Sequence, residues 1–144
     1  MRRVGTLVAL LFASITVAAP KATAGPATAI AGARVTVPGG SYTNVGPATV
    51  KEMLARKNFV LINVHVPYEG EIEQTDATIP YDQVEQKIDR VAPDRNAPIL
   101  VYCRSGHMSA TAVETLVRLG YSSVWHLEGG FNAWQQAGFA LHKK

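Results

Sequence analysis

The stretch that decides the fold lies at residues 98–109 and reads PILVYCRSGHMS. Its first five residues form a short apolar run with β-branched side chains, which is typical of a strand buried on both faces of a parallel sheet. Cys103 follows directly, and apolar residues then recur at helical spacing from about Met108 to Leu119. The stretch therefore predicts a buried strand, a tight loop that carries Cys103, and a helix.

The same alternation of strand and helix patterns extends to both sides of this stretch. Further strand patterns occur at residues 41–45, 59–64 and 123–127, and helical spacing occurs at residues 47–57, 82–91 and 131–136. Residues 68–78 are acidic and irregular, and they predict a solvated surface loop. Strands that alternate with helices over this length predict an α/β fold, with a parallel sheet and helices on both faces.

Residues 1–24 have the three-part plan of a secretory signal peptide. Met1-Arg2-Arg3 is positively charged, the 16 residues Val4 to Ala19 are almost wholly apolar, and Ala22-Thr23-Ala24 is a small-x-small cleavage signature. The apolar run is shorter than the roughly 20 residues that span a hydrocarbon core. We therefore predict cleavage after Ala24, a periplasmic or secreted location, and no stable membrane insertion after cleavage.

The remainder of the chain divides into a leader and one domain. Residues 25–40 are rich in Ala, Gly, Thr and Pro and predict a flexible leader, with a short extended piece at Ala33–Val37. The domain is predicted at residues 41–142. Without the three basic residues of the signal, 11 basic residues face 11 acidic ones, so no basic surface suggests nucleic acid as a partner.

Cys103 is the only cysteine, which rules out a framework of disulfides within the domain. A lone thiol in an oxidising compartment is open to mixed disulfides and overoxidation. Such a cysteine is either buried and inert, as free cysteines commonly are, or it is retained because it reacts. The residues that flank it distinguish the two.

The flanking residues favour a reactive Cys103. The carboxyl ends of parallel strands are where ligand sites form, and the first turn of the next helix offers unpaired N–H groups that stabilise a thiolate. Gly106 permits a positive φ, so that the loop can turn its N–H groups inward around an anion. Ser105 and Ser109 add hydroxyl donors, and Arg104 adds a positive charge.

Two nucleophilic chemistries fit such a loop, attack on a phosphoryl ester and transfer of sulfur. Low-molecular-weight and dual-specificity phosphatases need an arginine six positions after the cysteine, where it binds the phosphate with two hydrogen bonds. That position is Ser109 here, and Arg104 lies on the wrong side of the loop to replace it. A phosphatase or an arsenate reductase is therefore disfavoured.

Two blocks of sequence resemble the rhodanese family. Residues 103–109, CRSGHMS, resemble its active-site loop, and residues 127–138, LEGGFNAWQQAG, resemble its carboxyl-terminal signature. The resemblance covers roughly residues 45–140, and the short, exported form is most similar to the phage-shock-type periplasmic rhodaneses. It implies a rhodanese fold, which is a five-stranded parallel sheet with helices on both faces.

The resemblance also implies a reaction. The Cys103 thiolate would take the outer sulfur of a donor such as thiosulfate, release sulfite, and pass the sulfur from a Cys103 persulfide to a thiol or cyanide. Backbone N–H groups of the loop would bind the persulfide, and no metal or organic cofactor is needed. These loop residues are Arg104, Ser105, Gly106, His107, Met108 and Ser109. The acceptor thiol can also belong to a partner protein.

Departures from the family pattern mark further residues. Asn63-Val64-His65 stands where many members have Asp-Val-Arg, and Met108 stands where arginine or lysine is common. His65 is a candidate for the pocket, because it follows a strand at the carboxyl edge of the sheet; the alternative is a structural hydrogen bond. The four histidines lack metal-ligand spacing, so no metal site is expected. A persulfide carrier, or a binding or sensing module with little turnover, is the alternative function.

Overall fold

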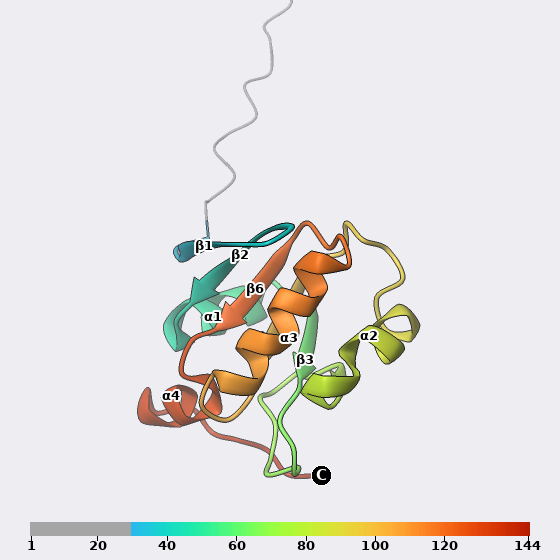
Figure 1. Cartoon of the computed structure of the whole chain (residues 1–144). Coiled ribbons are helices and arrows are strands. Elements are labelled where there is room, and N and C mark those ends of the chain that lie inside the picture. The colour runs from blue at the N-terminus through green and yellow to red at the C-terminus, as the bar shows by residue number, and fades with distance from the viewer. Residues whose placement is uncertain (1–29) are drawn as a thin grey trace, which may run out of the picture.

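The computed structural model describes residues 30–144, so the predicted signal peptide and the first part of the predicted leader lie outside it. Six strands form one sheet in the order β1-β2-β6-β5-β3-β4 (Figure 1). They are β1 (Ala33–Val37), β2 (Gly40–Val45), β3 (Val60–Asn63), β4 (Ala77–Thr78), β5 (Ile99–Tyr102) and β6 (Val124–Leu127). Every neighbouring pair is parallel except β1 and β2. The predicted α/β class is confirmed, and the sheet is parallel as predicted except at the β1–β2 pair.

Helices cover both faces of the sheet, as predicted (Figure 1). They are α1 (Pro47–Ala55), α2 (Val84–Lys87) between two 3-10 turns at Tyr81–Gln83 and Ile88–Arg90, α3 (His107–Arg118) and α4 (Gly130–Gln136). The helical segment predicted at 82–91 is therefore broken into three short pieces. No helix within residues 30–144 is both long and apolar enough to cross a membrane.

Strand β5 runs through the middle of the sheet and joins two hydrophobic cores. Ile99 and Val101 point toward the core under α2 and α3, while Leu100 and Tyr102 point toward the core under α1 and α4. All four side chains are buried, so the period-2 alternation of a strand supplies both layers from one apolar run. Cys103, the next residue, is therefore anchored on both sides.

The first strand corrects two expectations, the five-strand count and the leader. Residues 33–37 pair antiparallel with β2, from Ala33 opposite Asn44 to Val37 opposite Gly40. Residues 33–40 thus belong to the domain, as a strand and the turn that leads into β2. Pro38-Gly39 makes the tight turn, with Gly39 at φ 93°, which is the position that a Pro-Gly turn requires.

The segment at residues 68–78 is anchored to the domain, which corrects the prediction of a solvated loop. Glu71 and Ile72 are buried, and the two residues Ala77–Thr78 pair with β3 as the edge strand β4. Glu71 and His142 exchange two backbone hydrogen bonds of 2.8 Å each, so the segment is also tied to the C-terminal end. Its single large aliphatic side chain, Ile72, is too little signal to predict this burial from the sequence.

Candidate active site

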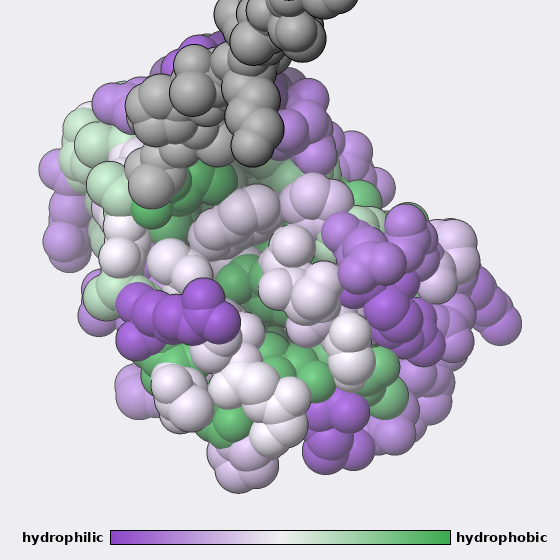
Figure 2. Space-filling model, turned by 90° about the horizontal axis from the view of Figure 1, so that it is seen from above, coloured by the Kyte–Doolittle hydropathy of each residue, from purple (hydrophilic) through white to green (hydrophobic). Residues whose placement is uncertain are grey.

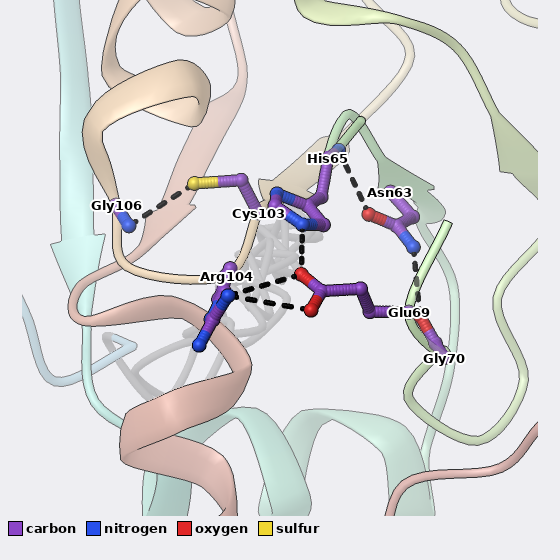
Figure 3. Close-up of polar contacts among 7 residues, drawn as sticks. All are labelled: Asn63, His65, Glu69, Gly70, Cys103, Arg104 and Gly106. Carbon is purple, nitrogen blue, oxygen red and sulfur yellow. Dashed lines mark hydrogen bonds and ion pairs between the residues drawn. The ribbon is translucent and has the colours of Figure 1, made fainter. Parts of the chain in front are cut away.

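Cys103 lies in the turn between β5 and α3, at the carboxyl end of a central strand. Cys103 is only 1% exposed, so its thiol is shielded from bulk solvent. The backbone N–H of Gly106 donates to Cys103 Sγ at 3.0 Å (Figure 3). Gly106 precedes α3 at φ 102°, a left-handed conformation that glycine adopts without strain. The loop thus places one main-chain donor on the sulfur, where the sequence predicts several N–H groups around it.

The N-terminal end of α4 donates two backbone hydrogen bonds to the Cys103 loop. The N–H of Phe131 donates to the carbonyl of Cys103 at 2.9 Å, and that of Asn132 donates to the carbonyl of Arg104 at 3.0 Å. This approach requires a glycine at position 130, because a Cβ atom there would lie 2.3 Å from the carbonyl oxygen of Cys103. The two sequence blocks that carry the family resemblance are therefore in direct backbone contact.

A chain of buried hydrogen bonds runs inward from the sulfur. The Ser109 hydroxyl lies 3.3 Å from Cys103 Sγ and 2.7 Å from Nε2 of His126, and Nδ1 of His126 lies 2.8 Å from Oδ1 of Asn44. Because the Asn44 oxygen only accepts, Nδ1 carries the proton and Nε2 accepts from Ser109. The single Ser109 hydrogen can therefore serve only one of three acceptors at any moment: Nε2 of His126, the sulfur, or the carbonyl of Gly106 at 3.2 Å.

The surroundings of His126 favour its uncharged form. Burial lowers the pKa of His126 from 6.5, and the backbone contact with Gly106 and the charge of Glu128 oppose that shift without cancelling it. The ring also packs edge-on against Tyr42, with centroids 5.9 Å apart. In the sequence, His126 stands out only as part of a predicted strand, and Asn44 does not stand out at all. The two residues are 82 positions apart in the chain, and the pairing of β2 with β6 brings them together.

A second group of side chains lies on the outer side of the loop (Figure 3). Nε2 of His65 hydrogen-bonds to one carboxylate oxygen of Glu69, and Nη1 of Arg104 lies 3.3 and 3.4 Å from the two carboxylate oxygens. His65 is 7% exposed, and its ring packs edge-on against Phe131 at 5.5 Å. His65 therefore lies on the outer side of the loop and makes there the structural hydrogen bond that was its alternative role.

Asn63 fixes the backbone around this outer group. Its Oδ1 accepts from the N–H of His65 at 3.0 Å, and its Nδ2 donates to the carbonyl of Gly70 at 3.0 Å. One buried amide thus connects the end of β3 to the segment that carries Glu69 (Figure 3). Glu69 was expected to be a solvated acid, and only its contacts in the fold identify it.

The remaining loop residues make different contacts. Ser105 and His107 are exposed, while Met108 is partly buried against the core under α3. Gly106 and Ser109 are thus the loop residues that contact the sulfur, and Arg104 turns outward to Glu69. Within residues 30–144, no three His, Cys, Asp or Glu side chains are grouped so that they could hold a metal ion.

The opposite end of the molecule has a different surface. Helix α3 begins at the lower end in Figure 1, and Figure 2 shows the domain from the other end, from above. Hydrophilic residues alternate there with small, separate hydrophobic patches (Figure 2). At the carboxyl edge of the sheet, in contrast, the Gly106 N–H and the Ser109 hydroxyl are directed at the sulfur of Cys103.

Several known proteins are similar to this chain in sequence or in structure. Thiosulfate sulfurtransferase PspE of Escherichia coli is 31% identical over 77 residues, which cover 54% of this chain and 74% of that protein. Thiosulfate sulfurtransferase GlpE of Pseudoalteromonas translucida is 26% identical over 106 residues, with 67% of this chain and 92% of that protein covered. The solved structure of a rhodanese-related protein from Thermoplasma volcanium matches with a TM-score of 0.59 and 28% identity, over 68% of this chain and 95% of that one.

A family model described as a rhodanese-like domain matches residues 47–137. The matched range contains β5, the Cys103 loop, α3 and the glycines on which the loop rests. With this match over more than half of its length, the chain belongs to the rhodanese-like domain family.

Proposed function

We propose that this protein is a sulfurtransferase that carries sulfane sulfur on Cys103 as a persulfide. The Cys103 thiolate attacks the outer sulfur of a donor such as thiosulfate; a new S–S bond forms, and the bond to the sulfite group breaks with its electron pair leaving on sulfite. An acceptor thiolate or cyanide then attacks the outer sulfur of the persulfide, and Cys103 leaves as the thiolate. No net oxidation occurs in the cycle.

The observation that carries this proposal is the backbone N–H of Gly106 directed at Cys103 Sγ at 3.0 Å. Hydrogen bonds from backbone N–H groups are strengthened when the acceptor is an anion, so this donor can bind an anionic sulfur. Ser109 supplies a second donor when its hydrogen turns from His126 to the sulfur. Membership of the rhodanese-like family supports sulfur transfer as the reaction class.

Intact-mass measurement after incubation with thiosulfate tests the proposal. The wild-type domain is expected to gain the mass of about one sulfur atom, and excess cyanide is expected to remove it. Cys103→Ser removes the only thiol and is expected to abolish the gain. Thr111→Ala, an exposed change further along α3, is the matched control and should keep it. A wild-type protein that alkylates at Cys103 but never gains sulfur from thiosulfate or from an alkyl persulfide would refute the proposal.

We also propose that the protein is exported and acts in the periplasm or outside the cell. The support is the signal-peptide pattern of residues 1–24 in the sequence. N-terminal sequencing of the protein recovered from a periplasmic extract is expected to begin at or next to Gly25. A protein that retains Met1 in that extract would contradict cleavage.

A further inference from the structure

The outer side of the Cys103 loop holds one cation and one anion in contact. Arg104 follows Cys103 directly in the chain, and its guanidinium meets both carboxylate oxygens of Glu69. His65 is placed close by, because the parallel pairing of Asn63 with Tyr102 continues through a 2.9 Å hydrogen bond from the N–H of Val64 to the carbonyl of Tyr102. Both His65 and Arg104 therefore direct N–H groups at the same carboxylate (Figure 3).

The contact between Arg104 and Glu69 determines the charge that an incoming anion encounters near Cys103. Arg104 is the charged donor that would attract a dianion to the sulfur, yet its partner carboxylate carries an opposite charge at the same place. Glu69 is held in position, because the His65 ring is buried and because Asn63 links the Glu69 segment to β3. The positive charge of Arg104 is thus largely cancelled for any donor that arrives at Cys103.

We propose that Glu69 is a specificity-determining residue of the Cys103 site, which selects against dianionic sulfur donors and favours sulfane-sulfur donors of low negative charge, such as alkyl persulfides. The proposal rests on the proposed function, since it names the class of donor for the same cysteine. Thiosulfate remains a substrate, but Glu69 repels both of its charges. Removing the carboxylate charge frees Arg104 to attract anions.

The first test measures charge selectivity without any sulfur transfer. Cys103 is the only thiol, so its alkylation can be followed in the intact protein. The ratio of its rates with iodoacetate, an anion, and iodoacetamide, which is uncharged, cancels changes in thiolate content and in access. Glu69→Gln is expected to raise this ratio about two- to fourfold at low ionic strength, with the increase lost in high salt.

Two further variants keep this test decisive. Glu73→Gln removes an equal charge from the same segment, but Glu73 pairs with Lys51 on the α1 side, so the ratio should stay unchanged. Arg104→Gln is expected to lower the ratio, and the double variant with Glu69→Gln should return it toward the wild-type value. An unchanged ratio in Glu69→Gln with native circular dichroism, or an equal rise in Glu73→Gln, overturns the proposal.

A second measurement separates this proposal from the proposed function. In Glu69→Gln, kcat/KM for thiosulfate is expected to rise about four- to tenfold, because the donor is a dianion, while kcat/KM for an alkyl persulfide, which is at most a monoanion, rises no more than about two- to threefold. A shifted alkylation ratio with no transfer from either donor refutes the sulfurtransferase function and leaves the charge selectivity intact. Active transfer with equal effects on both donors refutes the role of Glu69 alone.

Discussion

The two sides of Cys103 differ in charge and in burial. The inner side consists of the Gly106 N–H and the chain through Ser109, His126 and Asn44, and it is uncharged and largely buried. The outer side pairs Glu69 with Arg104, whose side chains are 38% and 54% exposed. A buried polar group that loses its partner costs about 1–3 kcal/mol, whereas an exposed ion pair contributes about 0–1 kcal/mol. The inner side should therefore govern stability, and the outer side selectivity.

The largest effect on stability is expected at Gly130, which lies against the backbone carbonyl of Cys103. Gly130→Ala would place a Cβ atom 2.3 Å from the Cys103 carbonyl oxygen, at φ 58°, so the loop and α4 must separate. We expect the free energy of unfolding to fall by at least about 3 kcal/mol in urea titrations. Gly120→Ala is the matched control: its φ of 93° is also positive, but nothing lies within 4 Å. A loss in Gly130→Ala no greater than in Gly120→Ala would show that the close approach is unimportant.

His126→Leu tests the buried chain directly. The substitution removes the acceptor of the Ser109 hydroxyl and the donor to Asn44, both in a buried setting. We expect a loss of about 1–3 kcal/mol in the free energy of unfolding, measured by urea titration. His107→Leu makes the same change at an exposed position and should stay within about 0.5 kcal/mol of wild type. Equal losses in the two variants would contradict the contrast between the sides.

The pH dependence of stability reports on the same histidine. Burial lowers the pKa of His126 below 6.5 in the folded state, so the unfolded chain takes up this proton first as the pH falls. The free energy of unfolding is therefore expected to decrease between about pH 7 and pH 5.5. In the His126→Gln variant, the part of this decrease in the free energy of unfolding that is due to His126 should disappear. Identical slopes for wild type and variant over that range would show that His126 does not cause it.

The smallest effect on stability is expected on the outer side. Arg104→Gln breaks an exposed pair with distances of 3.3 and 3.4 Å, and it should change the free energy of unfolding by less than about 1 kcal/mol. The same variant is expected to lower the relative reactivity of Cys103 toward anions. A large loss of stability in thermal or urea unfolding would mean that the outer pair also holds the loop together.

The parts of the site that the sequence predicts are those that are contiguous in it. Cys103, Gly106 and Ser109 lie in one strand-loop-helix stretch, so turn chemistry and helix geometry place them together. His126 and Asn44 meet only because β2 and β6 pair in a particular register, which hydrophobic patterns do not specify. The sheet shows the same division, because its four inner strands have recognisable strand patterns in the sequence and the two-residue edge strand β4 has none.

Glu69 illustrates a different limit. Four acids between residues 69 and 76 look equivalent in the sequence, yet Glu71 is buried, Glu73 pairs with Lys51, and Glu69 meets Arg104. Their environments are set by Ile72 and by the backbone bridge to His142, which are tertiary contacts. Composition alone therefore predicts a solvated charge run, and the fold assigns each carboxylate its own partner.

The main-chain donor on Cys103 has an evolutionary consequence. Every residue type except proline carries a backbone N–H, so this contact with the sulfur does not depend on which side chains the neighbouring loop positions carry. Substitutions at exposed positions such as Ser105 and His107 therefore leave that donor in place. A family built on such a loop can inherit one reaction and still diversify its substrates through the residues that surround it.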